Sequence, residues 1–280
     1  MELQLRNRTL SFDRSRVMGV LNVTPDSFSD GGWFQSADAA FEQAETMAAE
    51  GADIIDVGGE STRPGAEELP VQQELDRVMP VIERIVQRLD IAVSIDTSKP
   101  EVMREAVAAG VALINDVFAL RKEGALEAAA KGDAAVCLMH MQGTPQTMQD
   151  APKYRDLPGE IIDFLAERVR VCREAGMGTE RLLVDPGFGF GKTDRHNLAI
   201  LANLDEFRAL KLPILVGLSR KQTLGKLTGR GAGERLAAGL AAAVIAVANG
   251  ASMVRTHDVA PTVDALKVFD AVRAAEQERQ

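Results

Sequence analysis

Cysteine and histidine are scarce in this chain. It has two cysteines, Cys137 and Cys172, and three histidines among 280 residues. Two thiols this far apart offer neither a disulfide framework nor the paired spacing of a structural zinc site. Cys137 falls in an apolar, strand-like run and Cys172 in a helix-like one. So few thiols are typical of a protein from a reducing compartment.

Long apolar runs and an excess of positive charge are also missing. The chain is charged from Glu2 onward, so it lacks the apolar core of a signal peptide. The most apolar stretch, residues 239–248, is mostly alanine and too short to span a bilayer. The net charge of −9 makes nucleic acid a poor partner. We therefore expect a cytoplasmic protein without a membrane or nucleic-acid partner.

Short apolar runs alternate with longer amphipathic patterns along the whole chain. Because most of the short runs are continuously apolar, they are typical of parallel strands buried on both faces. Several helical patterns end at a glycine, as helix C-caps do: Gly51, Gly110, Gly176 and Gly250. The strands are expected at 17–21, 54–57, 92–95, 112–114, 135–139, 182–184, 214–216 and 253–256. Helices are expected at 37–50, 72–88, 100–109, 160–175, 197–210, 234–249 and 263–276.

About eight such strand–helix units predict an α/β fold of the (β/α)8 TIM-barrel type. A doubly wound open sheet is the alternative. No linker or low-complexity stretch divides the sequence, so residues 1–280 are expected to form a single domain. Residues 1–12 are expected to form a short hairpin ahead of the first barrel strand.

A polar residue ends or follows every expected strand. One such residue is often only a helix cap or a turn, but in a barrel all eight positions meet at the C-terminal mouth. Carboxylates and amides there suit the N–H groups of a heterocycle, whereas basic groups suit phosphate oxygens. The positions are Asn22, Asp56, Asp96, Asn115 with Asp116, His140, Asp185, residues 219–221 and residues 255–257.

Eight sequence blocks at these strand ends resemble, in order, the signatures of one family. The first is MGVLNVTPDSFSDGG at residues 18–32, and the second is DVGGESTRPG at residues 56–65. The others are residues 94–100, 114–116, 138–143, 183–192, 217–221 and 255–259. Together they resemble the dihydropteroate synthases over nearly the whole chain. The resemblance implies that 6-hydroxymethyl-7,8-dihydropterin pyrophosphate is joined to p-aminobenzoate with release of pyrophosphate, a step of folate biosynthesis and a sulfonamide target.

The resemblance also implies a role for each residue of the mouth. Asn22 corresponds to a ligand of Mg²⁺, an ion that needs few protein oxygens when it also binds substrate phosphates. The pterin ring would be read by Asp96, Asn115 and Asp185, with the charge of Asp96 stabilising a developing carbocation. Lys221 would bond the pterin and line the p-aminobenzoate site, and Ser219 would also bind substrate. The pyrophosphate would be held by Thr62, Arg63, Arg255 and His257.

The glycine-rich loops complete the implied site. Phe28 and Pro64 would cover p-aminobenzoate, and Phe190 would form a wall of the pocket. Asp30, in the first loop, would act in a closed state. The catalytic set implied is Asp96, Lys221, Arg63 and Asp30. Of the remaining histidines, His140 is interpreted as structural and His196 as lying on a helix surface.

Some features depart from the family pattern, and alternatives remain open. Gln222 stands where the family commonly has serine, Trp33 is bulky for a first-loop residue, and Val117–Phe118 replaces smaller or polar residues. The alternatives are a pterin-dependent methyltransferase domain, a non-catalytic pterin-binding protein and a Schiff-base aldolase using Lys221. The alanine-rich helix at 236–248 favours close packing of two subunits, so a homodimer is expected.

Overall fold

The computed structural model describes residues 1–23, 33–61, 65, 68–144, 146–148 and 152–278. Eight parallel strands form a barrel in the order β8-β7-β6-β5-β4-β3-β10-β9. A parallel bridge between Val184 and Ile214 joins the two end strands, so the sheet closes on itself. The strands are β3 (Arg16–Asn22), β4 (Ile54–Gly58), β5 (Ala92–Asp96), β6 (Leu113–Asp116), β7 (Ala135–Met139), β8 (Leu182–Asp185), β9 (Leu215–Gly217) and β10 (Met253–Thr256). The predicted barrel is confirmed.

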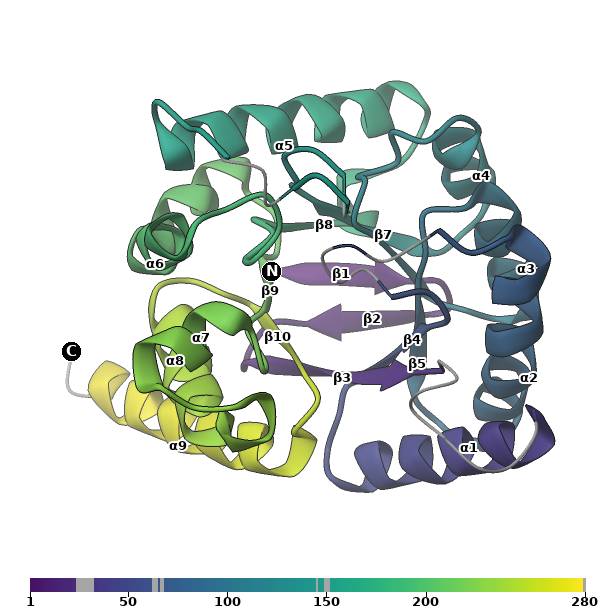
Figure 1. Ribbon diagram of the computed structural model, residues 1–280, viewed down its shortest axis with the longest axis horizontal. Helices are drawn as coiled ribbons and strands as arrows, with labels where there is room; N and C mark the ends of the chain where they lie inside the picture. Colours follow the sequence, from purple (N-terminus) through teal and green to yellow (C-terminus); the bar gives the residue numbers. More distant parts are fainter. Residues whose placement is uncertain (24–32, 62–64, 66–67, 145, 149–151, 279–280) are drawn as a thin grey trace.

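Helices surround the barrel on its outer side (Figure 1). They are α1 (Trp33–Ala49), α2 (Val71–Arg88), α3 (Pro100–Ala109), α4 (Ala125–Lys131), α5 (Leu157–Glu174), α6 (Asp194–Ala202), α7 (Gln222–Thr228), α8 (Leu236–Ala248) and α9 (Val259–Gln277). Short 3₁₀ turns lie at Thr179–Arg181, Leu204–Leu210 and Ala232–Glu234. Within the described ranges, none of the helices is both long and apolar enough to cross a membrane.

The helix predictions hold with two kinds of correction. The helix expected over 197–210 is wrong as one element, because α6 ends at Ala202 and a 3₁₀ segment follows from Leu204. The two helices that the sequence did not reveal, α4 and α7, have only seven residues each. A segment of this length makes fewer than two helical turns, which is too short for apolar residues to repeat on one face. The cap at Gly110 is confirmed: its φ of 113° is left-handed, where glycine avoids the strain of a side chain.

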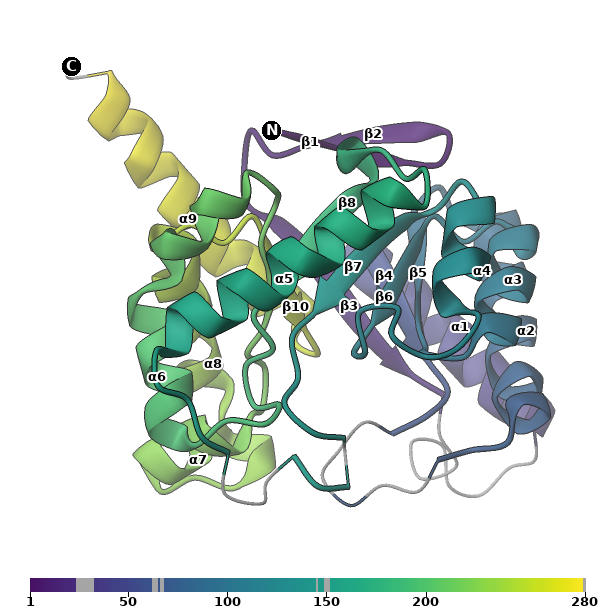
Figure 2. The same ribbon diagram turned by 90° about the horizontal axis from the view of Figure 1, so that it is seen from above.

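The predicted N-terminal hairpin is present and closes one end of the barrel. Strands β1 (Glu2–Leu5) and β2 (Arg8–Ser11) pair in antiparallel fashion. Leu3 and Leu5 are buried against interior residues such as Met18 and Leu183. Burial of each leucine stabilises the fold by about 2 kcal/mol. Figure 2 shows the hairpin at the end of the barrel opposite the long strand-to-helix loops, which leaves the C-terminal mouth open.

Candidate active site

Six of the predicted site residues meet in one hollow at the C-terminal mouth. The hollow has a volume of about 350 Å³ and opens to solvent. Parallel strands bring residues from distant parts of the chain together because their carboxyl ends lie at the same end of the barrel. The predicted residues in its wall are Asp96, Asn115, Asp185, Phe190, Lys221 and Arg255. Val117, Met139, Phe188 and Gly217 complete the wall and were not predicted to belong to the site.

Arg255 binds two carboxylates at the base of this hollow. Its Nη2 donates to Asp96 Oδ2 at 2.7 Å, and its Nε donates to Asp56 Oδ2 at 2.6 Å. Asn115 Nδ2 donates to the same Asp56 oxygen at 3.0 Å. Asp56 is fully buried, and its position at a strand end did not predict these contacts. It fixes the side chains of both Asn115 and Arg255.

Asp96 faces Arg255 and does not cap the helix that follows it. Helix α3 begins after Lys99, and no side chain caps its N-terminus. Burial raises the pKa of Asp96 to about 7, although the positive charge of Arg255 opposes the shift. The Asp96 carboxyl group can therefore exchange its proton near neutral pH, as a group that takes part in chemistry often does.

Asp185 ends β8 deep in the same hollow. Its Oδ1 accepts a hydrogen bond from the backbone N–H of Gly187 at 2.7 Å. Burial raises the pKa of this carboxyl, and the bond from Gly187 and the charge of Lys221 oppose the rise. The backbone bond holds the side chain in one orientation at the pocket wall.

Lys221 and Phe190 form another part of the wall. The Lys221 Nζ lies 4.1 Å from the centroid of the Phe190 ring, a cation–π contact. Burial, followed by the charge of Arg255, lowers the pKa of Lys221 to about 8. The lysine therefore keeps most of its positive charge at pH 7.

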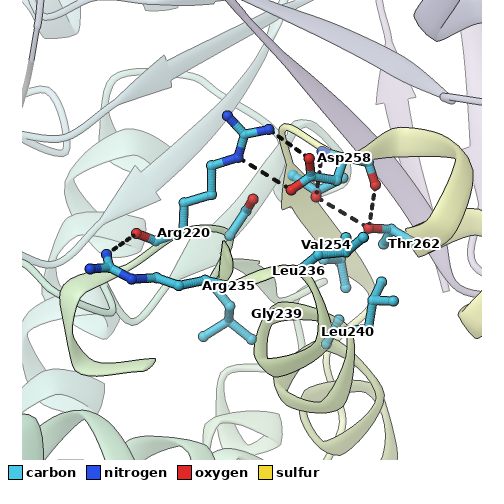
Figure 3. Close-up of a pocket in the computed structure, with 12 residues that line it drawn as sticks. Arg220, Arg235, Leu236, Gly239, Leu240, Val254, Asp258 and Thr262 are labelled. Carbon is cyan, nitrogen blue, oxygen red and sulfur yellow. Dashed lines mark hydrogen bonds and ion pairs between the residues drawn. The ribbon is translucent and has the colours of Figure 1, made fainter. Parts of the chain in front are cut away.

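The residue before Lys221 has an unusual backbone. Arg220 has a φ of 58°, in the left-handed region that a non-glycine residue seldom adopts. Arg235 Nη1 donates to the Arg220 carbonyl at 2.9 Å, and Arg220 pairs with Asp258 at 2.6 Å (Figure 3). These contacts hold the backbone that turns Lys221 into the hollow.

Ser219 and His257 lie beside the hollow and do not line it. Ser219 Oγ lies 3.1 Å from His257 Nδ1 and accepts the His257 backbone N–H at 3.3 Å. Burial and the charge of Arg255 lower the pKa of His257 to about 4, so the ring is neutral at pH 7. Ser219 borders a second hollow of about 280 Å³, which lies between β10 and α8 (Figure 3).

Asn22 ends β3 at the mouth, and its surroundings fit a hard cation. A side-chain carbon on Gly58 would lie 3.9 Å from Asn22 Oδ1 and 3.7 Å from Asp96 Oδ2. Because glycine stands there, both oxygens face a space that no side chain from that residue fills. An amide oxygen is a ligand that Mg²⁺ accepts. Within the described ranges, no three His, Cys, Asp or Glu side chains group as a metal site.

Some sequence predictions concern residues beyond this cluster. Phe28, Asp30, Thr62, Arg63 and Pro64 lie outside the described residues. Among the departures noted above, Val117 lines the hollow and Gln222 is the exposed first residue of α7. Trp33 begins α1.

The two remaining histidines have structural surroundings. His140 is buried and not part of the pocket wall, in agreement with its structural interpretation. His196 is half-buried at the start of α6. There its backbone N–H bonds to Thr193 Oγ1 and its ring to the Thr193 backbone N–H, forming a capping box.

The closed barrel and this mouth are those of a barrel enzyme that binds a flat, nitrogen-rich ring close to positive charge. The family model described as pterin binding enzyme matches residues 18–257. The dihydropteroate synthase of Escherichia coli (strain K12) is 51% identical over 280 residues, which cover 100% of this chain and 99% of that one.

Solved structures agree with this match. The dihydropteroate synthase of Yersinia pestis, in a sulfonamide drug complex, has 50% identity and a TM-score of 0.94 over 98% of this chain and 100% of the other. The Xanthomonas albilineans enzyme in complex with 7,8-dihydropteroate has 48% identity and a TM-score of 0.89, covering 98% and 99%. The chain belongs to the pterin binding enzyme family and, within it, to the dihydropteroate synthases, which are transferases.

Proposed function

We propose that the protein condenses 6-hydroxymethyl-7,8-dihydropterin pyrophosphate with p-aminobenzoate, giving 7,8-dihydropteroate and pyrophosphate. The observation that carries the proposal is the convergence of Asp96, Asn115, Asp185, Lys221 and Arg255 on one hollow. An aminopyrimidinone edge offers adjacent N–H groups, which a buried carboxylate accepts well. Asp185 would accept that edge, and Asn115 would bond the ring beside it.

The reaction is a dissociative substitution at the pterin methylene. The bond between the methylene carbon and the pyrophosphate oxygen breaks first, and the pyrophosphate leaves with the electron pair. The Asp96 carboxylate stabilises the cationic methylene that remains. The amine nitrogen of p-aminobenzoate then forms the new C–N bond and loses a proton. No protein nucleophile takes part.

Positive charge at the rim would stabilise the leaving pyrophosphate. Arg63 and Arg255 would supply this charge, and the neutral His257 ring and Thr62 would bind the same oxygens through hydrogen bonds. Mg²⁺, when held by the Asn22 amide and the substrate phosphates, supplies further positive charge to the leaving group. In the free protein Arg255 is paired with Asp56 and Asp96. It would therefore also restrain Asp96 before the substrate binds.

The p-aminobenzoate would lie against the wall that Phe190 and Lys221 form together. Phe28 and Pro64 would cover it, and Ser219 would lie near its carboxylate side. A sulfonamide, as a p-aminobenzoate analogue, would compete for this space. Asp30 would act when the first loop closes.

The protein would work as a cytoplasmic homodimer. Helix α8 leaves an apolar stripe exposed: Ala237, Ala241, Ile245 and Ala248. Ile245 is 47% exposed, and Leu227 and Leu236 nearby in the chain are 58% and 44% exposed. Exposed apolar residues along one face of a helix favour an interface there. A second copy of the same helix would bury the stripe, because small residues allow close approach.

Product analysis tests the proposed reaction. Purified protein is incubated with the pterin pyrophosphate, p-aminobenzoate and Mg²⁺, and 7,8-dihydropteroate is measured by mass spectrometry. The proposal expects one dihydropteroate for each pyrophosphate released. Pterin binding without any product would instead support a non-catalytic pterin-binding protein.

A further inference from the structure

A buried lysine holds the loop between β8 and α6 from its inner side. Lys192 is only 2% exposed. Its Nζ lies 2.9 Å from His140 Nδ1, 2.9 Å from the Phe190 carbonyl oxygen and 3.3 Å from the His140 carbonyl oxygen. Burial lowers the pKa of Lys192 to about 7. In its ammonium form the group has three N–H donors, and each has an acceptor here. Neither Lys192 nor His140 lines the substrate hollow.

His140, which accepts a hydrogen bond from Lys192, is held in place by its surroundings. Burial lowers the pKa of His140 to about 2, so its ring is neutral and Nδ1 can accept a hydrogen bond from Lys192. The edge of the ring packs against Phe164, with centroids 5.0 Å apart and planes at 88°. His140 therefore has little freedom to move away from Lys192.

The loop itself is seated tightly on the segment after β7. A side-chain carbon on Gly187 would come within 1.9 Å of the His140 carbonyl oxygen, and one on Gly191 within 2.4 Å of the Gln142 carbonyl oxygen. The Tyr154 hydroxyl also donates to the Gly191 carbonyl at 2.7 Å. The backbone on both sides of Phe190 therefore has a defined place.

Phe190 is thus held from two directions. Its carbonyl oxygen accepts a hydrogen bond from Lys192, and its ring lies under the Lys221 Nζ on the pocket side. Loss of the Lys192 ammonium would leave the Phe190 carbonyl and two acceptors of His140 without that donor. The peptide after Phe190 could then rotate, and the ring would lose its fixed place in the wall.

We propose that Lys192, supported by His140, is a positioning residue that sets the Phe190 wall of the substrate hollow and thereby the binding of p-aminobenzoate. The inference rests on the proposed function, because it assigns Phe190 to the p-aminobenzoate side. Lys192 acts only through Phe190 and touches no substrate. Its effect on the reaction must therefore disappear when Phe190 no longer forms the wall.

A double-mutant cycle tests this dependence. Lys192→Met keeps the length of the side chain and removes its charge, and Phe190→Leu removes the ring. We expect each single variant to raise KM for p-aminobenzoate about tenfold, with kcat changed less than about threefold. The double variant should be no worse than Phe190→Leu alone, because the two residues act as one unit. Effects that multiply to about a hundredfold would overturn the proposal.

Variants of His140 provide a second, independent readout. The amide oxygen introduced by His140→Asn would lie near the position of Nδ1, so this variant should keep KM within about twofold of wild type. His140→Leu removes that acceptor and should resemble Lys192→Met. Equal effects of both substitutions would contradict the proposal. Lys211→Met, at an exposed lysine, is the control and should leave KM unchanged.

Wild-type turnover tests the proposed function separately. If the wild-type protein makes no product, the same cycle is measured on the dissociation constant of 7,8-dihydropteroate. Additive losses of affinity for 7,8-dihydropteroate would overturn the positioning role of Lys192. Non-additive losses would support that role even though the proposed reaction had failed.

Discussion

Arg255 Nη2 donates a hydrogen bond to Asp96 Oδ2 at 2.7 Å, across 159 positions of sequence. The same guanidinium binds Asp56, which also accepts from Asn115. One half-buried arginine therefore fixes the carboxylate that would stabilise the cationic methylene. The buried Asp56 links this pair to Asn115, which would bind the pterin ring.

The pH dependence of kcat/KM should follow buried groups that titrate near neutral pH in the free protein. We expect activity to fall as pH drops below about 7, because protonation of Asp96 removes the charge that stabilises the cation. We expect a second fall at higher pH, where Lys192, with a pKa of about 7, and Lys221, with a pKa of about 8, lose their protons. In Asp96→Asn the acid limb should vanish, with kcat lower by about a hundredfold. An unchanged acid limb in that variant would assign it to another group.

Asp96 should also make the fold less stable as pH rises. Its pKa is raised from 3.8 to about 7 in the folded state, so the folded protein binds the proton more tightly than the unfolded chain. This contribution to stability is fully present below pH 3.8 and is lost as pH rises through about 7. The urea midpoint of Asp96→Asn, relative to that of wild type, should therefore increase between pH 5 and pH 8.

Removal of Arg255 should destabilise the protein through its partners. Arg255→Met leaves Asp56 and Asp96 buried without their cation, at a cost of about 3 kcal/mol in the free energy of unfolding. Urea denaturation followed by circular dichroism measures the loss. Adding Asp56→Asn removes one stranded charge and should recover part of it. A double variant that is less stable than Arg255→Met would contradict this account.

Chelation of divalent cations should stop turnover without unfolding the protein. We expect EDTA to abolish product formation and excess Mg²⁺ to restore it, because the metal would neutralise the leaving pyrophosphate. Asn22→Ala should raise the Mg²⁺ concentration needed for half-maximal activity about tenfold. Full activity in EDTA would remove Mg²⁺ from the mechanism.

The exposed stripe on α8 should hold two subunits together. We expect Ile245→Glu to shift the protein to monomer in light scattering coupled to size-exclusion chromatography, because a buried unpaired charge is costly. Leu198→Glu, at an apolar residue of α6 that is 37% exposed, is the matched control and should remain dimeric. A monomeric wild-type protein would contradict the proposed dimer.

Much of the barrel could be predicted because its signals are local. Continuous apolar runs marked the strands, and residues such as Asp96 and Asp185 could be placed at the mouth by counting from the strand ends. The break between Ala202 and Leu204 was missed, because the apolar pattern continues across it. Local patterns report which residues face the core, and they do not fix where one helical segment ends.

The supporting contacts could not be predicted, because they join distant parts of the chain. Asp56 and Arg255 are 199 positions apart, and Lys192 and His140 are 52 apart. In the sequence, Lys192 is the last residue of a glycine-rich stretch, and such stretches often form exposed loops. Only the folded barrel shows that this lysine lies beneath the loop and that His140 is its acceptor.

The most direct test of the central claim is the dependence of pyrophosphate release on p-aminobenzoate. Pyrophosphate is measured from 6-hydroxymethyl-7,8-dihydropterin pyrophosphate and Mg²⁺, with and without the second substrate. We predict release that requires p-aminobenzoate and matches the dihydropteroate formed. Tight pterin binding with no release in either case would contradict a synthase and would favour a methyltransferase domain or a pterin-binding protein.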